Sequence, residues 1–373
     1  MQKGTHSETR LFFCGDLMTG RGIDQILPYP SEPRLYEPWV RDARDYVALA
    51  ERRNGPIERP VAFDYCWGDA LAELERFAPD LRIANLETGI TTCDDCWPGK
   101  GINYRMHPDN LPILTAAGLD LCTLGNNHVL DWGRAGLIET LDCLARAGIA
   151  TAGAGRDPAQ ARAPAIMQLP GNGRLVLFAL GMADSGVPPA WAASGCRAGI
   201  WRADEEESGA IVAYARKLHA RRDPGDILVC SIHWGGNWGY DIGRWRRELA
   251  HRLIEAGVDI VHGHSSHHPL GIECYRQRLI LYGCGDLLND YEGIRGHEEY
   301  RSELRVLYLV RFDAARNCLL GLEVVPLRIR RMRLQRAQPG EAAWLAQQLD
   351  RESRRLGSRV TLGKDGRLYL QVQ

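Results

Sequence analysis

The sequence lacks a long apolar run, an excess of charge of one sign, internal repeats and low-complexity segments. No stretch reaches the roughly 18 apolar residues that a membrane-spanning helix needs, so we expect no membrane contact. Lys and Arg together number 46 and Asp and Glu 47, which argues against a general nucleic-acid partner and against an acidic disordered chain. Residues Met1–Arg10 are polar and lack the apolar core of a signal peptide, so we expect a cytoplasmic protein.

A disulfide framework is also not expected. The eleven cysteines are odd in number, and most lie in apolar runs such as Phe13-Cys14-Gly15, where cysteine behaves as a small buried hydrophobe. The C-x-x-C motif of Cys93 and Cys96 has no second pair with which to complete a zinc site. We therefore interpret it as a loop that carries two thiols.

The sequence does contain a regular alternation of apolar runs and amphipathic segments. The apolar runs predict strands at Leu11–Cys14, Leu81–Ala84, Leu119–Leu124, Leu175–Leu180, Ile227–Ile232, Asp259–Val261, Leu279–Tyr282 and Val306–Phe312. The amphipathic segments predict helices at Asp69–Phe77, Leu111–Ala117, Leu137–Ala147, Glu205–His219 and Trp245–Ala256. Strands that alternate with helices in this way predict an α/β fold.

Two segments interrupt this alternation. Residues Pro28–Pro60 are rich in Pro, Arg and aromatic residues, with a helix predicted at Arg41–Arg53. We interpret them as an insertion (about 28–60) in a single domain that spans residues 1–326. Residues 327–373 form a C-terminal extension that we expect to pack on the same domain.

The extension has three recognisable parts. A basic stretch of five arginines comes first: Arg328, Arg330, Arg331, Arg333 and Arg336. Anion binding is one interpretation, but we favour a solvated face with Ile329 and Met332 packing inward. A helix is predicted near Glu341–Arg355. A hairpin is predicted at Lys364-Asp365-Gly366, since Asp-Gly favours a tight turn.

Polar residues gather just after the predicted strands, where α/β proteins build their sites. The six strand-end motifs are Gly15–Arg21, Asn85–Thr88, Gly125–Asp131, His233–Gly236, His262–His268 and Gly285–Tyr291. Each motif alone is typical of a turn or of a satisfied histidine. Six in series predict a divalent-metal site, because carboxylate, amide oxygen and imidazole together can ligate such an ion.

These motifs resemble the CapA family, named for capsule and poly-γ-glutamate synthesis, within the calcineurin-like metallophosphoesterase superfamily. The resemblance runs from about Leu11 to Val325 and includes the segment Pro98–Pro108. It implies an α/β/β/α sandwich with the metal site at the C-terminal ends of the strands. It also implies an enzyme that uses one or two divalent ions, with Ca, Mg, Mn and Zn all open.

The superfamily's motifs carry over one residue at a time. The metal ligands that the resemblance implies are Asp16, Glu87, Asn127, His233, His264 and His267. The residue after the asparagine, His128, matches a non-ligating acid or base, and Asp131 is placed to orient it. The spacing before the last ligand is one residue longer than in the superfamily, so His267 is preferred while His268 stays an alternative.

One ligand position departs from the superfamily. The histidine normally found two positions after the first aspartate is Met18 here. A thioether is a poor ligand for a hard cation, so this ligand is lost. Two-metal hydrolysis needs both ions. Either a single ion remains, or water replaces the missing imidazole and both ions remain.

The activity has several open interpretations. Fold analogy favours a phosphoester hydrolase, and the family name implies a role in poly-γ-glutamate or capsule biosynthesis. A non-catalytic, metal-stabilised binding protein is a further alternative. Another catalytic interpretation is acid–base catalysis on a peptide, leading to inversion at Cα. This reaction requires two opposed bases, and the candidates are His128 with Asp131 as one pair and Asp16 with His297 as the other.

We favour this last option first. Soluble CapA-like proteins include lasso-peptide epimerases, and this sequence is similar to that branch in its altered first motif and in the absence of a signal peptide. The predicted reaction is L to D epimerisation of a residue in a ribosomal precursor peptide.

Substrate contacts are expected around the metal site. The candidates are Lys100, Arg105, Trp234, Asp286 and Asn289. Lys100 and Arg105 can hold a carboxylate or phosphate, and Trp234 can stack on an aromatic side chain. Surface charge and loop packing are the alternatives. The expected partner is therefore a peptide or a small molecule.

Overall fold

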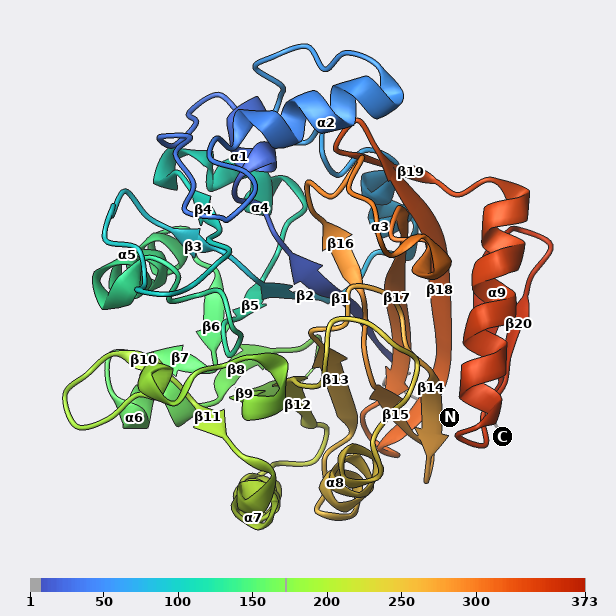
Figure 1. Ribbon diagram of the computed structural model, residues 1–373. Coiled ribbons are helices and arrows are strands. Elements are labelled where there is room, and N and C mark those ends of the chain that lie inside the picture. The colour runs from blue at the N-terminus through green and yellow to red at the C-terminus, as the bar shows by residue number, and fades with distance from the viewer. Residues whose placement is uncertain (1–7, 172, 373) are drawn as a thin grey trace.

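The computed structural model describes residues 8–171 and 173–372, and in these residues two large sheets pack face to face between layers of helices (Figure 1). The first sheet runs in the order β20 (Val360–Leu362), β21 (Leu368–Leu370), β18 (Cys318–Arg330), β17 (Leu304–Asp313), β1 (Glu8–Leu17), β2 (Leu81–Leu86), β5 (Leu121–Thr123) and β6 (Ala150–Ala152). In addition, β16 (Asp286–Leu288) pairs with β1 and β19 (Arg333–Arg336) with β18. This is the predicted α/β/β/α sandwich.

The second sheet is smaller. It runs in the order β11 (Arg202–Ala203), β9 (Arg174–Met182), β12 (Ile227–His233), β13 (Ile260–His264), β15 (Arg278–Leu281) and β14 (Ile272–Tyr275), with β8 (Ala165–Gln168) on β9. Two short pairs lie outside it: β3 (Gly89–Ile90) with β4 (Arg105–Met106), and β7 (Ala154–Gly155) with β10 (Gly199–Ile200). All eight predicted strands are present in the two large sheets.

The helices cover the outer faces of the two sheets (Figure 1). The first sheet is covered by α1 (Gly22–Ile26), α2 (Arg44–Asn54), α3 (Asp69–Phe77), α4 (Pro112–Ala116) and α5 (Gly133–Arg146). The second is covered by α7 (Ser208–His219) and α8 (Arg244–Glu255), with α6 (Pro158–Arg162) between β7 and β8 in the chain. Short 3-10 turns lie at Pro108–Asn110, Ala183–Ser185, Pro189–Trp191, Glu205–Glu207 and Glu298–Tyr300.

The central position of β1 in the first sheet explains why its sequence is apolar on both faces. Leu11 and Phe13 point into the core between the sheets, whereas Phe12 and Cys14 belong to the core under the helices. This period of two places alternate side chains on opposite faces of a central strand, so both faces must be apolar. The strand ends at Leu17, and the buried Asp16 just before its end belongs to the polar motif.

The C-terminal segment is continuous with the first sheet. Strand β18 runs through residue 326 as far as Arg330, and the following β20–β21 hairpin adds to its far edge. Helix α9 (Pro339–Arg354) runs beside β18 and β20 (Figure 1). Its residues Leu345 and Leu349 join the core between the sheets, and Ile329 and Met332 are buried as predicted.

In the part of the chain that the structure describes, no helix combines the length and the apolar character needed to cross a membrane.

We predict that α9 stabilises the whole sandwich. Leu349 is 2% exposed, and Leu349→Ala should lower the free energy of unfolding by about 2–5 kcal/mol because it leaves a cavity. The measurement is urea unfolding followed by circular dichroism. Gln347→Ala changes an exposed position of the same helix and is the matched control. Equal unfolding midpoints for the two variants would contradict this role.

Candidate metal centre

The metal-ligand candidates meet where strand ends of the two sheets approach each other. Asp16 is the penultimate residue of β1 in the first sheet, and His233 and His264 are the last residues of β12 and β13 in the second. One oxygen or nitrogen atom from each of the three lies within 4.8 Å of the others. The predicted position of the site, at the C-terminal ends of the strands, matches this arrangement.

Two glycines allow this approach. A Cβ atom on Gly15 would lie 1.9 Å from the carbonyl oxygen of Gly285, so only glycine fits beside Asp16. Gly285 itself has φ +72°, which glycine adopts without strain. The two Gly-Asp motifs at residues 15–16 and 285–286 thus bring two strand ends into direct contact, and Asp16 stands opposite Asp286 in the parallel β1–β16 pair.

The first group of candidate ligands consists of Asp16, His233 and His264. The Nδ1 atoms of the two histidines lie 2.8 Å apart, and His264 Nδ1 lies 3.9 Å from Asp16 Oδ1. Burial lowers the pKa of both histidines well below the ordinary value, so both rings are neutral. Neutral imidazole is the form that binds a metal ion.

The second group consists of Asp16, His267 and Asp286, whose ligand atoms also lie within 4.8 Å of one another. His267 Nδ1 lies 2.8 Å from Asp286 Oδ1. The other oxygen of Asp286 accepts a hydrogen bond of 2.6 Å from Asn289, and Asn289 accepts one of 2.8 Å from Arg305. Asp286 and Asn289, predicted as substrate contacts, therefore belong to the metal-ligand cluster and its support.

Glu87 and Asn127 complete the surroundings of the first group. Glu87 is buried, and burial together with the nearby Asp16 carboxylate raises its pKa well above the usual value. The Asn127 amide donates to the Ser185 carbonyl at 2.9 Å, while its buried Oδ1 has no hydrogen-bond partner among the described residues. A buried amide oxygen without a partner and two buried carboxylates that repel one another each fit a nearby cation.

His128 is held by a carboxylate and a lysine. Its Nδ1 lies 2.7 Å from Asp131 Oδ2, and Lys100 Nζ lies 3.3 Å from both that nitrogen and Asp131 Oδ1. Its Nε2 lies 3.7 Å from Glu87 Oε1. Burial lowers the pKa of His128 to about 4, against the opposing effect of Asp131. Lys100, predicted as a substrate contact, thus lies against this His–Asp pair.

Three other predicted residues make their contacts elsewhere. The His297 ring stacks on Trp238 with centroids 3.9 Å apart, and no hydrogen bond joins it to Asp16 within the described residues. The Arg105 guanidinium donates to the Cys93 carbonyl and lies over the Trp132 ring. Trp234 is buried and donates to the Tyr282 carbonyl at 2.8 Å. Their roles toward substrate stay predictions.

Sequence reasoning gave no role to three residues that shape the site. Asn85 donates to Asp16 Oδ1 at 2.7 Å and lies 3.4 Å from Glu87 Oε2, so it links two candidate ligands. The Tyr104 and Tyr291 hydroxyls lie 2.8 Å apart, and their rings pack against His128 and His267 respectively. Asn85 and Tyr291 both lie in strand-end motifs, whereas the contact of Tyr291 with Tyr104 joins segments 187 residues apart and has no local signal in the sequence.

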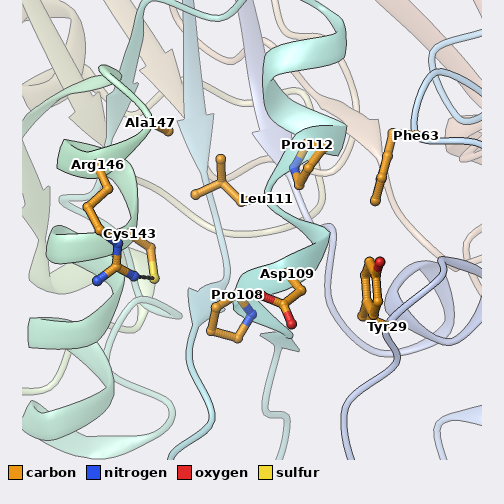
Figure 2. A pocket seen from close by; sticks show the side chains of 9 residues that line it. All are labelled: Tyr29, Phe63, Pro108, Asp109, Leu111, Pro112, Cys143, Arg146 and Ala147. Atoms are coloured by element: carbon orange, nitrogen blue, oxygen red, sulfur yellow. Dashed lines mark hydrogen bonds between the residues drawn. The ribbon is translucent and has the colours of Figure 1, made fainter.

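A surface pocket of about 610 Å³ lies between α4 and α5, and none of its lining residues is a candidate ligand (Figure 2). Tyr29 and Phe63 stand on one side of it, and Arg146, which contacts the Cys143 sulfur, stands on the other. The candidate ligands therefore lie outside this pocket.

The chain is similar to known proteins over most of its length. Residues 10–291 match the family described as bacterial capsule synthesis protein PGA_cap. A probable polyglutamine synthesis accessory protein of Mycobacterium tuberculosis is 49% identical over 355 residues, which cover 95% of this chain and 93% of that protein. PGA biosynthesis protein CapA of Bacillus subtilis is 26% identical over 321 residues, which cover 85% of this chain and 70% of that protein.

Among solved structures, a 5'-nucleotidase precursor from Thermus thermophilus matches with a TM-score of 0.44 and 15% identity. The match covers 91% of this chain and 58% of that one, so this chain spans less than two thirds of it. The match to the family over most of the chain, together with the 49% identical relative, shows that this chain belongs to the CapA family of bacterial capsule synthesis proteins.

Proposed function

We propose that this chain is a two-metal hydrolase that acts on a peptide. The observation that carries the proposal is that Asp16 belongs to both groups of candidate ligands. A carboxylate shared by two adjacent groups is how two-metal sites hold their ions close together. Asp286 enters the second group from β16, on the side where the superfamily's histidine is replaced by Met18, so the loss of that histidine leaves no gap in the ligand set.

The residues divide between two positions. Asp16, His233 and His264, with Glu87 and Asn127 beside them, would hold one ion, and Asp16, His267 and Asp286 would hold the other. Bound ions of this kind lower the pKa of a coordinated water molecule and stabilise negative charge that develops during displacement. The three buried carboxylates supply the negative charge that such ions require.

His128 is suited to proton transfer. Its Nδ1 is occupied by Asp131, so Nε2 faces the metal centre near Glu87. The neutral ring accepts a proton at Nε2, and Asp131 stabilises the imidazolium that results. The same proton can then pass to the leaving nitrogen. The peptide substrate is supported by the relatives, one of which is described as a polyglutamine synthesis accessory protein.

Epimerisation at Cα is the second candidate, and one observation favours it. Two His–Asp pairs face the site, His128 with Asp131 and His267 with Asp286. Burial lowers the pKa of His128, whereas the Asp286 carboxylate outweighs burial and raises the pKa of His267. One neutral and one protonated histidine are what removal and return of a proton require. The predicted Asp16–His297 pair is replaced in this scheme by His267 and Asp286.

We predict two divalent ions per chain, and Asp286→Ala should retain only one. Loss of a ligand carboxylate should lower the affinity for the second ion by more than roughly 10–100-fold, the effect typical of residues that only support a ligand. The measurement is elemental analysis after dialysis against trace Mn²⁺. Asp241→Ala removes an exposed carboxylate and is the control. Unchanged metal content in Asp286→Ala would contradict the two-metal proposal and leave epimerisation in place.

We predict that, once metal is removed, the buried Asp16 carboxylate lowers the stability of the protein at neutral and higher pH. Burial and the nearby Asp286 raise the pKa of Asp16 to about 7. Because the folded pKa exceeds the unfolded value of about 4, the stability from this group is present below about pH 4 and is lost as pH rises to about 7. Metal-free Asp16→Asn should therefore unfold at higher urea than the unmodified chain at about pH 8, with the difference shrinking at about pH 4. The same midpoint at the higher pH would refute this.

We predict that His128→Ala lowers turnover by about 10²–10⁴-fold, the usual contribution of general acid–base catalysis, without changing metal content. Turnover is measured on peptides that include glutamine and glutamate oligomers, by release of new amino termini. His219→Ala removes an exposed histidine and is the control.

The same incubations in D2O separate the two candidate reactions. New termini without deuterium at Cα support hydrolysis. Deuterium at one Cα without cleavage supports epimerisation and rules hydrolysis out. Full turnover in His128→Ala would overturn its role in either reaction.

A further inference from the structure

Four polar side chains share one face of the second sheet at the metal centre. Ser231 and His233 lie two residues apart on β12, and His262 and His264 lie two residues apart on β13. Residues at this spacing point to the same face of a strand, here the face toward the first sheet. The register pairs Ser231 with His262 and His233 with His264. Two of the four are candidate ligands, whereas Ser231 and His262 have no role in the site so far.

These side chains lie in surroundings where every polar atom needs a partner. Ser231 and His262 are fully buried, and His264 is 1% exposed. Ile227 and Val229, on the same face of β12, belong to the apolar core between the sheets. A buried donor or acceptor without a counterpart costs free energy, so the hydrogen bonds of these groups are constrained.

A chain of hydrogen bonds joins His264 to the backbone of the first sheet. His264 Nε2 lies 2.9 Å from Ser231 Oγ, and Ser231 Oγ lies 3.0 Å from His262 Nδ1. His262 Nε2 lies 2.9 Å from the carbonyl oxygen of Cys14 on β1. The chain thus begins two residues before Asp16 in one sheet and ends on a candidate ligand of the other.

The carbonyl of Cys14 sets the direction of the whole chain. A carbonyl oxygen accepts and cannot donate, so His262 donates to it through Nε2. Among the described residues no carboxylate pairs with His262, and a buried imidazolium without such a partner is costly, so the ring is neutral and its Nδ1 accepts. The Ser231 hydroxyl therefore donates to His262, and its oxygen accepts from His264 Nε2.

A third neighbour of Ser231 leaves this direction unchanged. Ser231 Oγ lies 3.4 Å from Thr123 Oγ1, and the Thr123 hydroxyl donates to Asn85 Oδ1 at 3.2 Å. If Ser231 donated to Thr123, His262 Nδ1 would be buried without a donor. Asn85 in turn donates to Asp16 Oδ1 at 2.7 Å, so Ser231 lies where the supports of candidate ligands from both sheets meet.

We propose that His262 and Ser231 are positioning residues that fix the tautomer of His264. Because Ser231 holds the proton on Nε2, the Nδ1 atom of His264 presents a lone pair. That nitrogen faces the metal centre, 2.8 Å from His233 Nδ1 and 3.9 Å from Asp16 Oδ1. A ligating histidine whose other nitrogen donates to a fixed partner binds its ion more tightly. This role rests on the proposed function in that His264 is taken as a metal ligand, but it does not depend on the reaction.

The first experiment determines the tautomer in metal-free protein. NMR of the ring nitrogens, above the ordinary histidine pKa of about 6.5, distinguishes protonated from unprotonated atoms, and the signals lost in His264→Gln identify the ring. We expect the proton on Nε2 in the unmodified chain. Ser231→Ala should shift it toward Nδ1, because Nε2–H would otherwise be buried without an acceptor. A proton on Nδ1 of His264 in the unmodified chain would overturn the proposal, whether or not the chain binds two ions.

The second experiment measures Mn²⁺ affinity by electron paramagnetic resonance of the free ion. Ser231→Ala and His262→Phe should each lower the affinity by about 10–100-fold, the range for residues that support a ligand. His262→Asn keeps an acceptor near the place of Nδ1 and should recover most of the affinity, although it leaves the Cys14 carbonyl unpaired. This recovery separates a fixed tautomer from a general loss of packing.

Ser353→Ala is the matched control. It removes another buried hydroxyl, which accepts from the Ile272 backbone of the second sheet at 2.9 Å, outside the metal centre. It should lower the urea midpoint as Ser231→Ala does, yet keep the Mn²⁺ affinity of the unmodified chain. The proposal is overturned if Ser231→Ala binds Mn²⁺ as tightly as the unmodified chain, if Ser353→Ala loses as much affinity, or if the two His262 variants lose it equally. An unmodified chain that binds no Mn²⁺ would contradict the two-metal proposal, and the tautomer would then decide this one.

Discussion

The structure depends on one constraint, the burial of several carboxylates at a single point. Asp16, Glu87 and Asp286 are almost fully buried where the two sheets meet. Each ionised carboxylate costs several kcal/mol to bury, and mutual repulsion adds to that cost. Hydrogen bonds from Asn85 and from the Ser265 backbone to Asp16 offset only a part of it. Burial keeps His233 and His264 neutral, so they bring no compensating charge, and His267 alone is placed to balance one carboxylate. A bound cation would balance the rest.

Closely packed strand ends and one strained backbone position bring these carboxylates together. Gly15 and Gly285 let two strand ends touch, which places two carboxylates side by side. Ser265 has φ 106°, a conformation that a residue with a side chain rarely adopts, and its backbone N–H lies 3.3 Å from Asp16 Oδ2. Such strain persists where the surrounding structure holds it, and here both cores lie directly beneath the site.

Sequence patterns predicted much of this fold because they are local. The alternation in β1 and the amphipathic face of α3, predicted with its observed bounds, required only neighbours in the chain. The strand-end motifs likewise predicted which side chains approach Asp16. Contacts between distant segments could not be predicted in this way. The Tyr104–Tyr291 pair and the packing of His297 on Trp238 depend on how loops fold over the sheet ends, and no periodicity encodes them.

The role of Asp286 depends on the same non-local information. In the sequence, Met18 marks a missing ligand, and nothing nearby replaces it. In three dimensions β16 lies alongside β1, and Asp286 joins Asp16 and His267 in one group of candidate ligands. The second group of candidate ligands contains two carboxylates and one imidazole, whereas the first contains two imidazoles and the Asp16 carboxylate. Oxygen ligands suit harder ions such as Mg²⁺, Mn²⁺ or Ca²⁺, and imidazole suits Zn²⁺ and related ions. The second imidazole would therefore make the first position more favourable than the second to a softer ion such as Zn²⁺.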